Sequence, residues 1–224
     1  MTKIIKNILQ KENIKQILIL LISSIFICIP LLLKNIDISY DDGIQHICRL
    51  MGTYQSLQEG QTFPVIMSNF CNGFGYSWNL FYSPITAYLP LIFKLINFSF
   101  IDCIKIFMFI ITFLSGITMY FFTKEVTKNK KIALISGIIY IFAPYRFTDM
   151  YLRNALAELT SFVFIPMIFQ RIIWHFKTKT EKRNIINSWN YTVIFNSYSN
   201  NYVCCYNMFY ISFNANKKIK REKN

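Results

Sequence analysis

The chain has 224 residues, of which 54% are hydrophobic and 17% aromatic, and its formal net charge at pH 7 is +13. A soluble domain of this length carries more charge and shorter apolar runs, so the composition excludes an ordinary soluble protein and indicates a polytopic membrane protein. The Lys and Arg residues flank the apolar runs, where membrane orientation and anionic lipid headgroups place them. The positive charge therefore does not indicate a nucleic-acid partner; the expected partner is membrane lipid.

The N-terminal residues 1–16 carry four Lys against one Glu, and their apolar side chains recur with a helical period. This pattern predicts a cytoplasmic amphipathic segment that leads into the membrane. A first span is predicted at about 17–33. A charged head followed by an apolar body is also typical of a cleaved signal peptide, but no small-x-small cleavage site follows, which favours an uncleaved span.

Three further spans are predicted at about 103–123, 132–144 and 155–173, which gives an all-α transmembrane domain over residues 17–177. Clusters of Lys and Arg follow the spans at 103–123 and 155–173, the second and fourth of the four. The positive-inside rule then places the N-terminus and both clusters in the cytoplasm, and residues 34–102 in a large first external loop. The expected location is the cell membrane, which the chain would cross several times.

The external loop contains an apolar and aromatic segment, 78–96, that complicates this topology. If the segment crossed once, the basic cluster at 124–131 would be exported, against the charge rule. Pro84 and Pro90 also interrupt it. We predict a re-entrant or interfacial piece, and a helical hairpin that crosses twice is the alternative. Cys48 and Cys71 would share this loop, which would allow a disulfide between them.

The C-terminal residues 178–224 differ in composition from the rest, because they hold ten Asn whereas residues 1–177 hold nine. They contain no apolar run of spanning length and no clear helical period. A disordered cytoplasmic tail would have this character, and so would a product of a shifted reading frame. The sequence leaves both explanations open.

The first cluster of charged residues follows the first span and contains Asp41, Asp42, His46 and Arg49. On a helix that starts near Asp41, the side chains at 42, 46 and 49 share one face. One Asp could act as the helix N-cap, but that role does not account for both, nor for His46 and Arg49. Two carboxylates and one His could also bind Mg²⁺ or Mn²⁺ weakly; no cofactor is predicted.

The second cluster lies between the third and fourth spans and contains Tyr145, Arg146, Asp149, Arg153 and Glu158. Arg146, Asp149 and Arg153 would form one stripe of a helix, and Glu158 enters the fourth span, where an ionised carboxylate needs a partner. Arg153 is only approximately in phase with Glu158, so Arg49 or Arg146 could serve instead. The cluster is either an internal salt-bridge set that fixes helix packing or an anion-binding site, because guanidinium groups bind phosphate through paired hydrogen bonds.

The order of these elements resembles the N-terminal part of GT-C type membrane glycosyltransferases. Four motifs also resemble an uncharacterised bacterial membrane family labelled "6-pyruvoyl-tetrahydropterin synthase-related". They are Asp-Gly-x-x-His-x-x-Arg at 42–49, Asn-Gly-x-Gly-Tyr at 72–76, Phe-Tyr-Ser-Pro at 81–84, and Pro-Tyr-Arg at 144–146 with Asp149, Tyr151, Arg153 and Glu158. The resemblance covers about residues 15–175. The pterin label implies no chemistry here, since a three-His zinc site needs more His than the two in this chain.

The resemblance to GT-C enzymes implies transfer of a sugar from a polyprenyl-phosphate donor on the outer face. Asp41 or Asp42 would remove the proton of the acceptor hydroxyl. Arg49, Arg146 and Arg153 would hold the departing donor phosphate, with His46, Tyr145, Asp149 and Glu158 in the same substrate-binding set. Members of such families carry many more spans, so the resemblance also implies that the chain corresponds to a fragment. The alternative is a non-enzymatic envelope protein with a structural or assembly role.

Overall fold

A computed structural model describes residues 11–33 and 41–179, and in these residues it contains helices and no strand. Three helical segments are long and apolar enough to cross a membrane. They lie in α2 (Lys11–Leu33), α6 (Phe100–Thr127) and α9 (Leu156–Lys179), with the spanning parts Asn13–Leu32, Phe100–Thr127 and Leu156–Trp174. For the residues that the structure describes, these findings confirm a helical fold with several candidate spans, as in a multi-pass membrane protein.

The third predicted span, 132–144, is not among these helices. Its apolar run forms α7 (Lys130–Ile141), a helix of 12 residues. At about 1.5 Å per residue this is roughly 18 Å, well short of the ~30 Å hydrocarbon core. The helix stops because Pro144 restricts the residue before it, and Ala143 adopts φ −58° and ψ 130°. Two short helical pieces follow, α8 (Pro144–Phe147) and the π-helix η2 (Thr148–Leu152).

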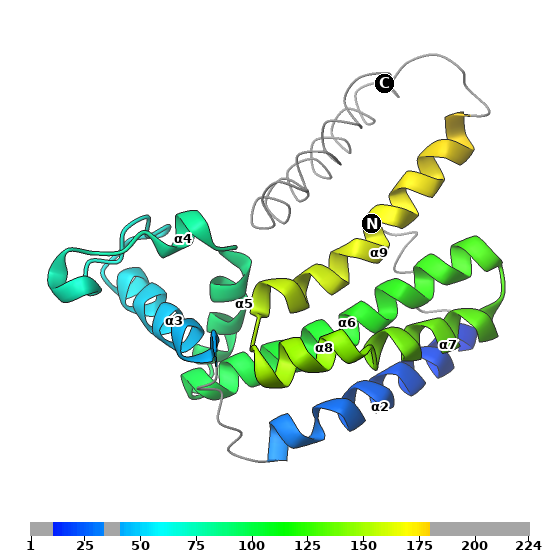
Figure 1. Ribbon diagram of the computed structural model, residues 1–224, viewed down its shortest axis with the longest axis horizontal. Helices are drawn as coiled ribbons and strands as arrows, with labels where there is room; N and C mark the ends of the chain where they lie inside the picture. The colour runs from blue at the N-terminus through cyan, green and yellow to red at the C-terminus, as the bar shows by residue number, and fades with distance from the viewer. Residues whose placement is uncertain (1–10, 34–40, 180–224) are drawn as a thin grey trace.

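The centre of the bundle is α6, which packs against α2, α7, α9 and α5 (Ile85–Lys94) (Figure 1). Close approach of α6 and α7 depends on Gly116 and Gly137, because a Cβ on Gly137 would lie 3.1 Å from the backbone oxygen of Gly116. Small residues at helix contacts are typical of membrane bundles. The turn between the two helices uses Lys128 in the left-handed region and Asn129, whose side chain accepts from the Lys131 N–H.

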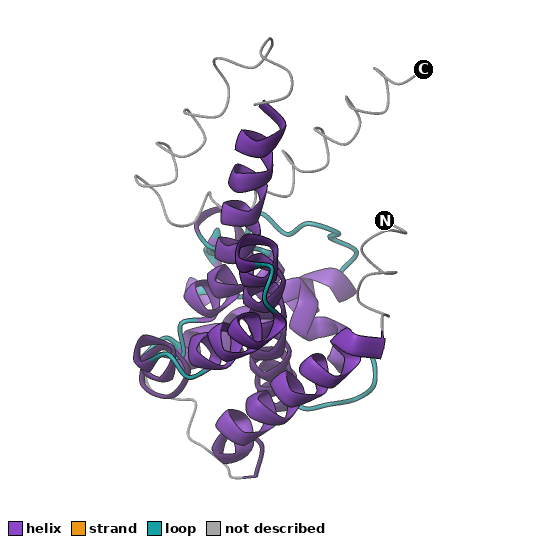
Figure 2. Ribbon diagram, turned by 90° about the vertical axis from the view of Figure 1, so that its right-hand side faces the viewer, coloured by secondary structure: helices purple, strands orange, loops and turns teal. Residues whose placement is uncertain are grey.

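Figure 2 shows helices joined by loops, and no strand, in the described residues. Residues 41–99, between α2 and α6, fold into shorter helices at one end of the bundle (Figure 1). They are α3 (Gly43–Gln58), the turn η1 (Cys71–Gly73), α4 (Trp78–Phe81) and α5 (Ile85–Lys94). The alternative of a hairpin that crosses the membrane twice is excluded by length, because α4 has 4 residues and α5 has 10. Cys48 and Cys71 are free thiols, so the disulfide that the shared loop would allow is not present.

The ends of the chain limit two of the predictions. The first ten residues of the amphipathic segment 1–16, the stretch 34–40 and the tail beyond Lys179 lie outside the described residues. In the described residues, α2 is one continuous helix from Lys11 to Leu33. No helix boundary at residue 17 therefore separates an amphipathic segment from the span. The orientation of the N-terminus stays a prediction.

Candidate functional site

The two charged clusters of the sequence meet where α3 begins. The backbone N–H of Asp42 donates to the carbonyl oxygen of Arg153 at 3.2 Å, which joins segments about a hundred residues apart. Asp42 stands at the N-cap position of α3, but its side chain makes no capping hydrogen bond. Asp41 is exposed and holds a positive φ of 49°. The capping role therefore does not explain either carboxylate.

The surroundings of Asp42 favour its protonated form. Partial burial raises the pKa of this carboxyl above its ordinary value, and the charges of Asp41 and Glu158 raise it further. The Arg153 guanidinium opposes this shift. A carboxylate whose pKa moves toward neutrality is better matched to proton transfer at physiological pH than an unperturbed one.

His46 lies on the buried face of α3 and contacts Tyr82, a residue that the sequence reasoning did not place in the site. The His46 Nε2 lies 3.3 Å from the Tyr82 hydroxyl oxygen, and this hydroxyl accepts from the Ala157 N–H of α9 at 3.0 Å. Burial lowers the pKa of His46 to about 4, and the Arg49 charge adds to this effect, so the imidazole is neutral at pH 7. Tyr82 thus links α3 to the start of α9. Its position in the Phe-Tyr-Ser-Pro motif was the available signal.

Arg49 is buried, with 1% of its surface exposed. Its guanidinium donates to the Thr86 hydroxyl at 2.8 Å and to the Ser83 carbonyl at 2.6 Å, and it lies over the Tyr82 ring. Burial lowers its pKa to about 10, so the group stays charged at pH 7. Arg49 therefore fixes the α4–α5 segment against α3, and it reaches no open surface in this arrangement.

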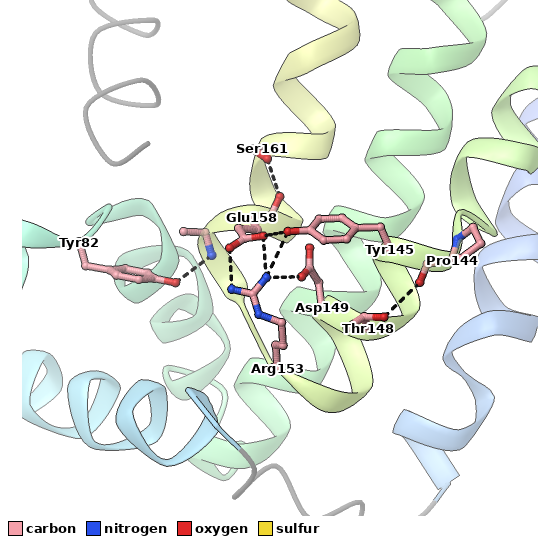
Figure 3. A network of polar contacts seen from close by, with 9 residues as sticks. Tyr82, Pro144, Tyr145, Thr148, Asp149, Arg153, Glu158 and Ser161 are labelled. Carbon is pink, nitrogen blue, oxygen red and sulfur yellow. Dashed lines mark hydrogen bonds and ion pairs between the residues drawn. The ribbon is translucent and has the colours of Figure 1, made fainter. Parts of the chain in front are cut away.

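The partner of Glu158 is Arg153, through two parallel hydrogen bonds of 2.9 Å each (Figure 3). A single straight helix over 146–158 would put these residues out of phase. The chain instead makes the π-helix η2 and then turns at Asn154, whose φ is 52°, before α9 begins. This turn folds Arg153 back over the first turn of α9.

Two more side chains complete this cluster (Figure 3). The Tyr145 hydroxyl donates to the Glu158 carboxylate and accepts from Arg153 at 3.1 Å. Asp149 pairs with Arg153 at 3.0 Å, although its own side chain is fully buried. One guanidinium thus holds two carboxylates and a phenol. These contacts form an internal ion-pair set, and the anion-binding interpretation stays a prediction.

Arg146 does not share the stripe predicted for it. It is fully buried and points to other helices: it donates to the Ser115 hydroxyl of α6 at 2.6 Å and lies 4.9 Å from the Phe162 ring centre of α9. Its Nε and one Nη have no hydrogen-bond partner. The π-helix explains the difference, because its wider turn changes the angular spacing after residue 147. The part of the chain that the structure describes therefore leaves only Arg153 as a partly exposed arginine in this site.

No group of three or more His, Cys, Asp or Glu side chains suited to a metal ion occurs among residues 11–33 and 41–179. Asp41, Asp42 and His46 are therefore not gathered into such a group. His46 instead faces Tyr82 through Nε2. The site therefore consists of a half-buried carboxylate, Asp42, beside a closed ion-pair cluster, in which the Arg153 guanidinium binds Tyr145, Asp149 and Glu158.

Asp149 provides a test of this electrostatic description. Burial raises its pKa to about 6, the charge of Glu158 raises it further, and Arg153 partly opposes both. Since the folded-state pKa lies above the unfolded value of about 3.9, the fold is favoured while Asp149 is protonated, and this contribution is lost as pH rises from about 4 to 6. His46 titrates across an overlapping window with the opposite sign. We therefore expect the difference in unfolding free energy between the wild type and Asp149→Asn to change across pH 4–6, as measured by thermal unfolding, and a constant difference would contradict this.

Comparison with known proteins finds a distant relative. Over 164 residues the chain is 26% identical to a protein of Lactococcus lactis subsp. cremoris (strain MG1363) described as "Uncharacterized protein". The match covers 71% of this chain and 26% of that relative, so the chain spans about a quarter of the relative's length. No protein-family model matches the chain. No solved structure matches it. The findings thus describe an integral membrane protein with a distant bacterial relative. They support neither the resemblance to GT-C enzymes nor the resemblance to the pterin-related family.

Proposed function

We propose that the chain forms the N-terminal membrane part of a GT-C-like glycosyltransferase that takes a sugar from a polyprenyl-phosphate donor at the outer face. Asp42 carries this proposal. Its carboxylate is half-buried, caps no helix and has a raised pKa next to Asp41 and Glu158. In the proposed reaction Asp42 accepts the proton of the acceptor hydroxyl as the oxygen attacks the sugar, and the donor phosphate leaves.

The substrate-binding part of the proposal centres on Arg153. The side chains of Arg49 and Arg146 are buried, whereas 37% of the Arg153 side chain is exposed. Arg153 would contact the departing phosphate, with Tyr145 and Glu158 fixing its orientation. Because Glu158 occupies both Nη atoms, a phosphate must compete with this carboxylate for the guanidinium.

Membranes that contain the full chain and receive radiolabelled polyprenyl-phosphate sugars test the activity directly. We expect transfer of label to an endogenous or added acceptor above the level of membranes without the chain. Absence of transfer with every polyprenyl-phosphate sugar supplied would contradict the proposal.

The closed ion-pair cluster favours a second candidate, an envelope membrane protein with a structural or assembly role. Arg153 uses both Nη atoms on Asp149, Tyr145 and Glu158, as a purely structural set would. In that case Arg153→Ala is expected to abolish a complex with another membrane protein, seen by co-purification, in preparations that show no transferase activity.

A further inference from the structure

The surface between α3 and α5 contains an open groove of about 410 Å³, a volume within the usual range for small-molecule sites. Both helices supply apolar lining residues, and Gln58 is an exposed polar residue among them. Leu91 in the wall is almost fully buried, whereas Ile92 is 52% exposed. The lining residues are Tyr54, Leu57 and Gln58 of α3, Tyr88, Leu91 and Ile92 of α5, and Leu95 directly after α5.

The groove lies beside the first residue of α6, a helix long and apolar enough to cross a membrane. Tyr54 in its wall packs edge to face on Phe100, the first residue of α6, with ring centres 5.6 Å apart. Leu95 and Ile96, between α5 and α6, are 80% and 68% exposed. Apolar side chains this exposed, directly before a candidate membrane span, are typical of a surface that contacts lipid.

A positive charge stands at the same place. The Lys94 ammonium group lies 4.6 Å from the Phe100 ring centre and 6.0 Å from that of Tyr54, and it donates to the Phe98 carbonyl at 3.2 Å. In the described ranges, no carboxylate lies within ion-pair distance of Lys94. An ammonium group has three donors, so Lys94 keeps donors for an anion.

We propose that this groove binds an anionic phospholipid of the membrane, with a hydrocarbon chain between α3 and α5 and the phosphate on Lys94. The site is separate from Asp42, because Tyr54 lies twelve residues further along α3, or about 18 Å. It does not rest on glycosyl transfer. The bound lipid would fix α5 against α3 and hold both at the membrane surface.

Native mass spectrometry of the full chain with phosphatidylglycerol or phosphatidylcholine tests the proposal. We expect phosphatidylglycerol to be retained about fivefold better, the difference that one lysine near a headgroup supplies. Lys94→Gln should abolish this preference, and Lys94→Arg should keep it. Ile92→Gln should reduce retention of both lipids about tenfold, because it places an amide in the path of the chain.

Leu89→Gln is the matched control for Ile92→Gln: Leu89 is on the same helix, is 44% exposed and does not line the groove. It should leave lipid retention unchanged. Equal retention of the two lipids by the wild type would overturn the proposal, as would normal retention by Ile92→Gln. A dimer that Ile92→Gln dissociates, without bound lipid, would assign the groove to a second copy of the chain instead.

Discussion

Replacing Asp42 with Asn is expected to lower sugar transfer by about 10²–10⁴-fold, the usual contribution of a general base. The amide keeps the shape of the side chain and removes its ability to accept a proton. Because the Asp42 side chain makes no capping hydrogen bond in the wild type, the free energy of unfolding should change little. The measurement is the initial rate of label transfer from a polyprenyl-phosphate sugar in membranes with equal amounts of chain.

Glu59→Gln is the control, because Glu59 is an exposed carboxylate beyond the other end of α3. It should leave the rate unchanged. Asp41→Asn should have a smaller effect than Asp42→Asn, since Asp41 is exposed and acts on Asp42 through its charge. Full activity after both Asp are changed would show that the catalytic assignment is wrong.

The two buried arginines should respond in opposite ways to replacement by Met. Arg49→Met is expected to lower the free energy of unfolding by about 2–4 kcal/mol, because it removes the charged hydrogen bonds to Thr86 and Ser83. Arg146→Met should be neutral or stabilising by about 1–4 kcal/mol, because two of its buried nitrogen atoms have no partner. Thermal unfolding in detergent, followed by circular dichroism, measures both.

Measuring both stability and sugar transfer of Arg146→Met distinguishes a structural role of Arg146 from a role in substrate binding. A buried charge that costs stability is retained when it serves another purpose. If Arg146 belongs to the substrate-binding set, Arg146→Met should be at least as stable as the wild type and defective in transfer. Destabilisation of Arg146→Met equal to that of Arg49→Met would contradict the description of its surroundings.

Much of the architecture follows from local patterns. Apolar runs of spanning length and their basic flanks indicated a membrane protein, and helices at Asn13–Leu32, Phe100–Thr127 and Leu156–Trp174 match three of the four predicted spans. The resemblance to GT-C enzymes also grouped Asp42 and Arg153 in one site, and the hydrogen bond between their backbones joins the two segments. Hydrophobic length and charge are properties of consecutive residues, so they need no knowledge of the fold.

Tertiary structure decided which side chains pair and which are buried. The length of α7, the turn at Asn154 that brings Arg153 to Glu158, and the burial of Arg49 and Arg146 all depend on backbone breaks or on neighbours from other helices. A helical period assumed across Arg146 to Glu158 fails where the backbone becomes a π-helix. Identical residue types thus acquire different roles, because burial and ion pairing arise from non-local contacts that local sequence does not encode.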